Sequence, residues 1–392
     1  MPGTLTRQLP GLLLAAVALP ALVTSCSHRD ETPAPSSEAA PTAASPAADP
    51  VCEQLSALSV RDKLAQLVMV GIRDAADARA VVTDHHVGGI FIGSWTELSI
   101  LTDGSLKEIK ESQAPTGPLP LAVSVDEEGG RVSRLSSLIG SSPSAKELAQ
   151  TNSAEQVREL AAQRGRKMAE LGITVDFAPV VDVVDADTDD DTVIGDRSFG
   201  ADPAKVTEYA GAYAQGLRDA GLLPVLKHFP GHGHGSGDSH TAGVVITPDL
   251  PQLQENDLIP YRTLVTQAPV AVMMGHLEVP GLTEDPASLS PAAVELLRTG
   301  TGYRAPAFDG PVFSDDLSSM AAITEHYGVA EAVLRSLAAG VDVALWVTTD
   351  EVPAVLDRLE QAVSAGELKQ EAIDASLARV AAVKRPGTHC HG

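Results

Sequence analysis

The sequence carries little basic charge and lacks long apolar runs, and both absences narrow its possible functions. Only 28 of the 392 residues are Lys or Arg, against 52 Asp or Glu, which gives a net charge of -24. Such an excess repels phosphate backbones, so nucleic acid is not an expected partner. The mean hydropathy of +0.04 and the 44% hydrophobic residues suit a large soluble core but not several membrane spans.

The N-terminal segment has the features of an export signal. An apolar run from Leu12 to Val23 follows Arg7 and is too short to cross a bilayer as a permanent helix. It ends in the small residues V-T-S before Cys26, which resembles the lipobox where bacterial lipoproteins are cleaved and acylated. We therefore expect residues 1–25 to be a lipoprotein signal peptide and Cys26 to carry a lipid anchor at the outer face of the cytoplasmic membrane or cell envelope. The alternative is an ordinary secretory signal with a chance cysteine.

Residues 26–50 are rich in Ser, Ala and Pro and contain no large apolar side chain. Such a segment cannot bury enough surface to offset the entropy of ordering, so we expect a disordered tether. The folded domain is then expected over residues 51–392.

This folded part alternates short apolar runs with longer amphipathic segments, the pattern of parallel strands covered by helices. Eight repeats predict an α/β fold, a closed (β/α)₈ TIM-like barrel forming a single catalytic domain. The expected strands are Leu64 to Ile72, Val87 to Ile92, Leu119 to Asp126, Val175 to Val183, Leu222 to Phe229, Pro269 to Gly275, Pro311 to Asp315 and Val341 to Val347. The expected helices include residues 154–171 and 205–220, and two terminal helices within 351–384. An open doubly wound sheet is the alternative, but no Gly-rich dinucleotide loop follows the first strand.

Two further cysteines, Cys52 and Cys390, flank this domain in a compartment expected to be oxidising. Because the termini of a barrel lie close together, we expect a disulfide between them. Two free thiols near flexible ends remain the alternative.

Ionisable residues gather where the proposed strands end. They are Asp126 after the third strand, Asp182 at the fourth, Lys227 and His228 at the fifth, His276 at the sixth and Asp315 at the seventh. Active sites of (β/α)₈ enzymes are built at this rim.

The segment from Lys227 to His240 reads K-H-F-P-G-H-G-H-G-S-G-D-S-H, and its glycines allow a loop that can move. Asp238 and His240 are two residues apart, so the carboxylate can contact one ring nitrogen and raise the basicity of the other. This pattern predicts a general acid/base dyad. Four histidines, His228, His232, His234 and His240, also permit a zinc site as an alternative.

Five motifs in order resemble the bacterial β-N-acetylglucosaminidases of glycoside hydrolase family 3, the NagZ type of peptidoglycan turnover. They are D-E-E-G-G-R-V-S-R at 126–134, F-A-P-V-V-D-V at 177–183, I-G-D-R-S-F-G at 194–200, the K-H-F-P-G-H-G loop with its D-S-H, and F-S-D-D-L at 313–317. The resemblance covers roughly residues 55–384. Family 3 β-glucosidases instead take their acid from another domain, which we do not expect in this chain.

The resemblance implies roles for individual residues. Asp315 matches the family nucleophile, and its neighbour Asp316 should point elsewhere, because consecutive strand residues face opposite sides. Asp238 and His240 match the dyad of a retaining mechanism. The residues implied in sugar binding are Asp126, Arg134, Arg197, Lys227 and His228. Arg131 matches a structural position, and Glu127-Glu128 departs from the commoner Gln-Glu without an expected effect on the chemistry.

The implied reaction is hydrolysis of terminal, non-reducing β-linked N-acetylglucosamine (GlcNAc) from cell-wall fragments in which it is joined to N-acetylmuramic acid (MurNAc). No metal or organic cofactor is required. One alternative is a phosphorylase of the same family, because a histidine acid/base repels phosphate less than a carboxylate does. Another is a lipoprotein that binds muropeptides without catalysis, against which the intact dyad and Asp315 argue. The sequence does not fix the oligomeric state, and a monomer is favoured.

Overall fold

The computed structural model describes residues 49–113, 118–240 and 243–390. The described residues form one compact unit. The expected signal peptide, Cys26 and nearly all of the expected tether lie outside the described residues. Within the described ranges, no helix has both the length and the apolar character needed to cross a membrane.

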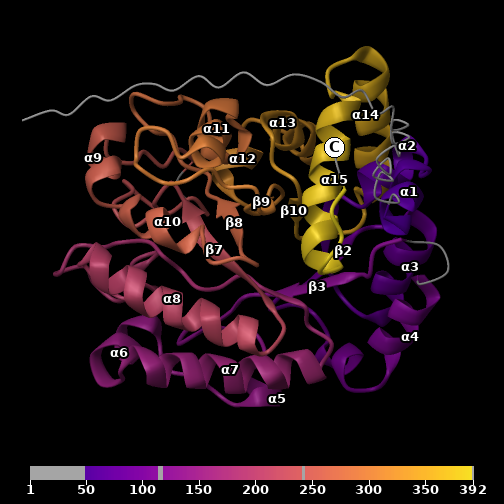
Figure 1. Cartoon of the computed structure of the whole chain (residues 1–392). Helices are drawn as coiled ribbons and strands as arrows, with labels where there is room; N and C mark the ends of the chain where they lie inside the picture. Colours follow the sequence, from indigo (N-terminus) through magenta and orange to yellow (C-terminus); the bar gives the residue numbers. More distant parts are fainter. Residues whose placement is uncertain (1–48, 114–117, 241–242, 391–392) are drawn as a thin grey trace, which may run out of the picture. The chain divides into compact units, whose positions relative to one another are not determined.

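Eight parallel strands form the core of this unit, as expected for a barrel (Figure 1). The strands are β1 (Val68–Ile72), β2 (Gly89–Ile92), β3 (Ala122–Val125), β6 (Val175–Asp176), β7 (Leu223–Phe229), β8 (Ala271–Met274), β9 (Val312–Ser314) and β10 (Ala344–Trp346). Their order is β10-β1-β2-β3-β6-β7-β8-β9. A parallel bridge between Phe313 and Val343 links β9 to the residue before β10, so the sheet is nearly closed.

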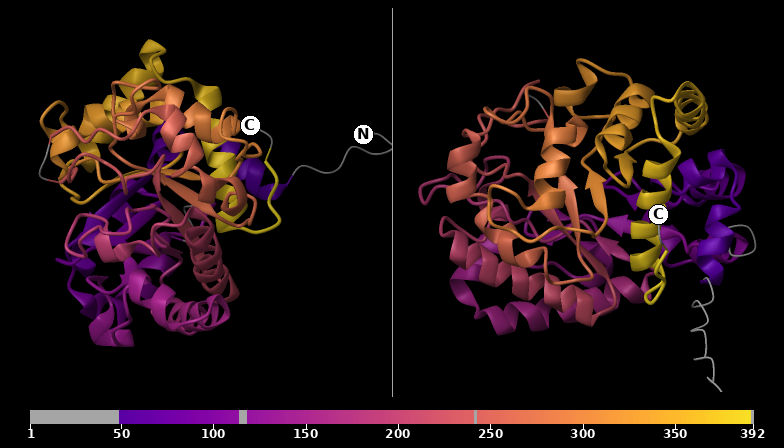
Figure 2. Two further views of the ribbon diagram at one scale, coloured as in Figure 1. Left: turned by 90° about the vertical axis from the view of Figure 1, so that its left-hand side faces the viewer. Right: turned by 45° about the horizontal axis from the view of Figure 1, so that its top comes forward.

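Helices cover the outside of the strands, as two further views show (Figure 2). The α-helices are α1 (Pro50–Ser56), α2 (Val60–Ala65), α3 (Ala75–His85), α4 (Ser105–Gln113), α5 (Ser136–Ile139), α6 (Ala145–Thr151), α7 (Ala154–Glu170), α8 (Pro203–Asp219), α9 (Leu250–Glu255), α10 (Ile259–Leu264), α11 (Pro291–Thr299), α12 (Ala321–Thr324), α13 (Val329–Ala339), α14 (Val352–Ala365) and α15 (Gln370–Lys384). Short 3-10 helices span Leu98–Leu101, Gly195–Arg197 and Ala287–Leu289.

The long helices begin where the sequence offers capping groups. A capping box of Ser153 and Gln156 starts α7, and Asp202 with Pro203 starts α8. The two helices lie side by side in Figure 1. Because strands and helices alternate along the chain, every β-to-α connection leaves the barrel at the carboxyl ends of the strands.

Most observed strands are shorter than expected, and two differ most from the expected bounds. The first strand begins at Val68 instead of Leu64, because Ser59 caps a short helix that contains Leu64. The fourth strand is regular only over Val175–Asp176, and an isolated parallel bridge joins Val180 to Lys227 beyond it. A small antiparallel hairpin, β4 (Glu127–Gly129) with β5 (Val132–Ser133), was not expected and follows β3 directly.

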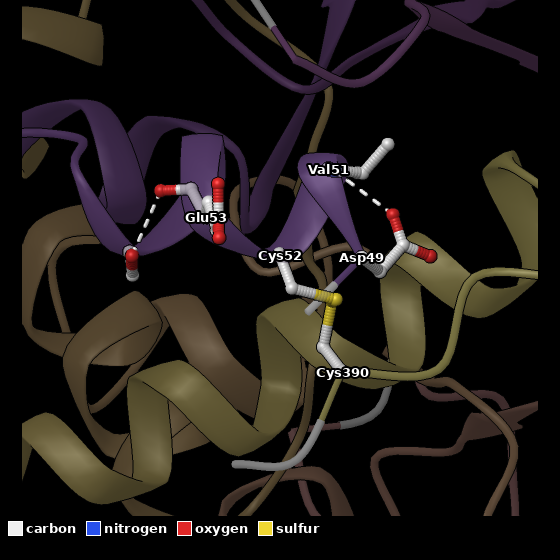
Figure 3. The surroundings of a disulfide bond; sticks show 6 residues. Asp49, Val51, Cys52, Glu53 and Cys390 are labelled. Atoms are coloured by element: carbon white, nitrogen blue, oxygen red, sulfur yellow. Dashed lines mark hydrogen bonds between the residues drawn. A yellow bond between two sulfur atoms is a disulfide. The ribbon is translucent and has the colours of Figure 1, made fainter. Parts of the chain in front are cut away.

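The two ends of the described domain are joined covalently (Figure 3). Cys52 on α1 and Cys390 beyond α15 form a disulfide with a Cα–Cα separation of 5.3 Å. The two cysteines are 338 residues apart in sequence, so the bond closes nearly the whole domain.

Candidate active site

The candidate site lies at the carboxyl ends of the strands, where the sequence placed it. Asp126 follows β3, Lys227 and His228 lie within β7, and Asp315 follows β9. A cavity of about 370 Å³ lies at the opposite end of the barrel, where the strands begin. Its lining includes Val68, Ala122 and Val175, the first residues of β1, β3 and β6. That cavity is lined mainly by apolar side chains and contains none of the expected catalytic residues.

A buried chain of alternating charges forms one wall of the site. The Lys227 ammonium lies 2.5 Å from Asp126 and 2.7 Å from Glu128. Glu128 also accepts two bonds from the Arg197 guanidinium, at 2.8 and 2.9 Å. Three of the expected sugar-binding residues, Asp126, Lys227 and Arg197, are therefore brought together.

Burial and neighbouring charges shift the pKa values of Glu128 and Lys227 in opposite directions. Burial alone would raise the pKa of Glu128, but the charges of Arg197 and Lys227 lower it well below its usual range. Burial would likewise lower the pKa of Lys227, and the carboxylates of Asp126 and Glu128 raise it instead. Glu128, Lys227 and Arg197 are therefore charged at neutral pH, and charged groups form strong hydrogen bonds with sugar hydroxyl and amide groups.

Sequence reasoning missed the role of Glu128. Its neighbour Glu127 faces away into a structural cluster, where it pairs with Arg164 and accepts hydrogen bonds from Ser133 and the Leu135 amide at 2.5 and 2.8 Å. The two carboxylates face opposite sides because Glu127 and Glu128 are consecutive residues of β4. The sequence did not predict this hairpin, so it could not separate their roles.

The two arginines of the first motif have separate surroundings. Arg131 pairs with Asp196 at 3.1 Å and donates to the backbone carbonyls of Thr192, Val193 and Ile194. It therefore holds the loop that carries Arg197. Arg134 is half-buried, and its Nε has no hydrogen-bond partner among the described residues.

Asp182 is a second residue whose role the sequence did not assign. Its carboxylate lies 2.7 Å from His228 Nδ1 and accepts bonds from the amides of His228 and His232 at 3.2 and 2.8 Å. A carboxylate at Nδ1 places a proton there and leaves Nε2 for other contacts. Burial acts to raise the pKa of Asp182, but the imidazole charge and hydrogen bond lower it.

Asp315 and Asp316 take different directions at the end of β9. Asp316 is held by Ser318 and Ser319, accepting from both hydroxyls and both amides. Its carbonyl accepts from His276 Nε2 at 2.7 Å, and His276 Nδ1 lies 2.6 Å from the Ser288 hydroxyl. Asp316 therefore fixes the turn, as expected for the residue that points elsewhere.

Asp315 is ionised. Burial acts to raise its pKa, but the charges of His228, His276 and Lys227 and the Asp316 amide lower that pKa to about 2. A half-buried carboxylate that stays charged at neutral pH has the protonation state that a nucleophile needs.

The Asp238–His240 pair has the expected geometry. His240 Nδ1 lies 2.7 Å from Asp238, which also accepts from the His240 amide at 2.9 Å. Both side chains are exposed on the loop that follows β7. The carbonyl of Ser239 accepts from the Ala322 amide at 3.3 Å, so the loop reaches α12, which follows Asp315. Burial would raise the pKa of Asp238, and its bonds from His240 lower it.

The remaining histidines of the loop have other partners. His234 Nδ1 lies 2.8 Å from Asp257, and His232 Nε2 lies 3.4 Å from the Ser239 hydroxyl. In the part of the chain that the structure describes, no group of three or more His, Cys, Asp or Glu side chains could hold a metal ion.

Known proteins resemble this chain over most of its length. The family model described as "Glycosyl hydrolase family 3 N terminal domain" matches residues 59–383. Beta-hexosaminidase LpqI of Mycobacterium tuberculosis is 66% identical over 390 residues, covering 97% of this chain and 99% of that protein.

Solved structures show the same likeness. A GH3 family glycosyl hydrolase from Mycobacterium smegmatis is 71% identical, with a TM-score of 0.82 over 85% of this chain and 99% of that one. A family 3 β-N-acetylglucosaminidase from a Paenibacillus species is 34% identical, with a TM-score of 0.77 over 84% of this chain and 62% of that one. The chain belongs to glycoside hydrolase family 3, as an enzyme with β-hexosaminidase activity.

Proposed function

We propose that the protein is a retaining exo-β-N-acetylglucosaminidase that removes terminal GlcNAc from peptidoglycan fragments of the GlcNAc-MurNAc type. One observation carries the mechanism: an ionised, half-buried Asp315 lies at the rim, and the loop with the Asp238–His240 pair contacts α12 just beyond it. A nucleophile and an acid/base on neighbouring segments are what double displacement requires.

In the first step, Asp315 attacks the anomeric carbon as the glycosidic C–O bond breaks. His240 Nε2 gives its proton to the leaving oxygen, and a glycosyl-enzyme forms. In the second step, His240 takes a proton from water, whose oxygen attacks the anomeric carbon and frees Asp315. Asp238 holds Nδ1–H throughout, which orients the imidazole and stabilises its charged form.

The buried chain of alternating charges described above supports recognition of a terminal sugar. Asp126 is the most exposed member and can accept from adjacent hydroxyls, whereas Lys227 and Arg197 can donate to hydroxyl or amide oxygens. His228, oriented by Asp182, and Arg134 complete the proposed set. The relatives named β-hexosaminidase and β-N-acetylglucosaminidase support an amino-sugar substrate.

The proposal is tested by incubating the full-length enzyme with a chromogenic GlcNAc glycoside and with GlcNAc-MurNAc, each with and without phosphate. We expect free GlcNAc as the product in all cases, formed initially as the β-anomer. GlcNAc 1-phosphate would favour the phosphorylase alternative, and α-GlcNAc as the first product would contradict retention. Asp309→Asn, an exposed aspartate before β9, is the matched control for Asp315→Asn and should remain active.

We also propose that Cys26 carries the lipid anchor and that the residues from Cys26 to the start of α1 at Pro50 are a tether between anchor and barrel. Cys26→Ala should then move the protein from the membrane to the soluble fraction without loss of specific activity. Unchanged membrane retention of this variant would contradict the anchor.

A further inference from the structure

Trp95 is a large aromatic side chain exposed at the rim of the barrel. It follows β2 and is 44% exposed, the highest exposure among the described tryptophans and phenylalanines. The second of the two tryptophans, Trp346, is fully buried. Trp95 has no place in the charged network, and the reaction described above does not use it.

The surrounding chain fixes the indole in this exposed position. A Cβ atom at Gly93 would lie 2.4 Å from the ring, and one at Gly71 would lie 2.9 Å from it. Both glycines therefore let the indole lie directly against the backbone. The Thr96 hydroxyl donates to the Ile72 carbonyl at 2.6 Å and accepts from the Gly93 amide at 3.0 Å, which fixes the loop.

Aromatic contacts connect Trp95 with the interior below the candidate nucleophile. Phe91 contacts the indole edge-on at 5.9 Å, Phe177 lies 5.7 Å from Phe91, and Phe313 lies 5.5 Å from Phe177. Phe313 precedes Asp315 by two residues. The indole is thus the exposed end of an aromatic row that passes through the barrel.

Trp95 lines a rim cavity of about 290 Å³. Its other lining residues are Gly71, Arg73, Val347, Thr348 and Thr349. The Val347 amide donates to the Ser318 hydroxyl at 3.0 Å, and Ser318 donates to Asp316 at 2.9 Å. One wall of the cavity is therefore hydrogen-bonded to the turn that carries Asp315.

The order of the strands indicates what could occupy this cavity. The proposed sugar-binding and catalytic groups lie in or after β3, β6, β7 and β9, whereas the cavity lies over the adjoining arc of β10, β1 and β2. The loop with His240 reaches α12, which follows β9 and so borders this arc. A leaving group protonated there would extend toward Trp95.

We propose that Trp95 is the platform for the sugar that leaves, the pyranose bonded to GlcNAc in the substrate. One face of a pyranose carries C–H groups, which pack against the apolar face of an indole, while its hydroxyls stay in contact with water and with Arg73 and Thr348. This inference rests on the proposed function, because it assigns the leaving part of that substrate.

Kinetics with two leaving groups test the platform. The substrates are GlcNAc-MurNAc and N-acetyl-β-glucosaminyl fluoride, whose leaving group is a single atom that cannot reach the indole. For Trp95→Ala we expect kcat/KM on the disaccharide to fall about tenfold more than on the fluoride, mostly through KM. Trp95→Phe should restore most of this difference. Leu138→Ala, at another exposed apolar residue on α5, should change neither substrate.

Fluorescence gives a readout that does not depend on turnover. Because Trp346 is buried, the emission of Trp95 should respond to a ligand stacked on it. Titration of Asp315→Asn with GlcNAc-MurNAc should change the emission, and the same titration of the Asp315→Asn, Trp95→Phe double variant should not. GlcNAc alone should leave Trp95 nearly unaffected.

Different results would contradict the Trp95 platform and the proposed function. Equal losses on both substrates for Trp95→Ala, or no loss on either, would overturn the platform while the wild-type enzyme still cleaves the disaccharide. An unchanged emission in the presence of saturating disaccharide would overturn it as well. If wild-type enzyme does not cleave GlcNAc-MurNAc, the proposed function fails and the platform falls with it.

Discussion

Asp315 accepts a hydrogen bond from the backbone amide of Asp316 at 2.9 Å, whereas the carboxylate of Asp316 accepts hydrogen bonds from the amide and hydroxyl of Ser318. The two neighbours therefore have separate tasks. Asp315 is kept charged by the surrounding cations, and Asp316 keeps the chain in the conformation that presents it.

This separation predicts different effects of two conservative changes. Asp315→Asn should lower kcat at least a thousandfold with little change in stability, because it removes the nucleophile and retains the shape. Asp316→Asn should lower the melting temperature and cost less activity, because its hydrogen bonds hold the turn. Thermal unfolding and kcat are measured for both variants. Equal loss of kcat in both at unchanged stability would mean that the wrong aspartate was assigned.

The adjacent glutamates form a second matched pair. Glu128→Gln should raise KM and reduce kcat/KM at least tenfold, because Lys227 and Arg197 lose the charge that positions them. Glu127→Gln should mainly reduce the free energy of unfolding, because it loses its pairing with Arg164. Steady-state kinetics and urea denaturation of the two variants separate these effects. A Glu127 variant with the larger kinetic defect would contradict the division of roles.

The disulfide should stabilise the domain without taking part in the chemistry. Replacing Cys52 and Cys390 together by serine should reduce the free energy of unfolding by about 2–4 kcal/mol, because the unfolded chain is no longer joined across its length. Activity below the melting transition should be unchanged. Wild-type enzyme treated with a reducing agent serves as the control and should approach the variant. A variant as stable as oxidised wild-type enzyme would show that the bond contributes nothing.

Lys384 at the base of the barrel predicts a pH dependence of stability. Its ammonium donates to the Gly88 carbonyl at 2.6 Å inside the cavity of about 370 Å³, and burial lowers its pKa to about 7. The unfolded chain, with a lysine pKa of about 10.4, binds more protons above pH 7. This group's contribution to stability therefore rises between about pH 7 and 10 and is smallest below pH 7.

Lys384→Met should accordingly raise the melting temperature at pH 6 by a few degrees, and its advantage over wild type should shrink toward pH 10. Lys107→Met, at an exposed lysine on α4, is the control and should show no such trend. Melting temperatures of the wild type and both variants, measured across this pH range, test the prediction. A constant difference at every pH would exclude titration of Lys384 as the cause.

The sequence predicted the barrel well because its strands are buried on both faces and stand out as apolar runs. Leu64 was misplaced in a strand because an apolar residue near a strand looks the same in a helix capped by Ser59. Asp126, Lys227 and Arg197 were anticipated from motifs, but the contacts of Lys227 and Arg197 with Glu128 join residues far apart in the sequence. Local sequence could not show which of two adjacent glutamates makes that contact.

Trp95 illustrates the same limit. Nothing in the letters G-S-W-T distinguishes an exposed aromatic platform from a core residue. Its exposure depends on Gly71 in another strand, whose missing side chain leaves room for the indole.

The central claim is that Asp315 forms a glycosyl-enzyme and that His240 supplies and then removes the proton. His240→Ala should lose far more activity on GlcNAc-MurNAc than on a GlcNAc glycoside of an acidic phenol, because only the poor leaving group needs protonation. With the phenol glycoside, the second step lacks its base, so the intermediate should accumulate.

The most direct measurement is therefore the mass of intact His240→Ala enzyme quenched during turnover of the phenol glycoside, followed by mapping of the modified peptide. We expect an added mass of one N-acetylglucosaminyl unit, located on Asp315 and removed by azide as the β-glycosyl azide. An adduct on another residue, or active enzyme with no adduct and no response to azide, would contradict the account.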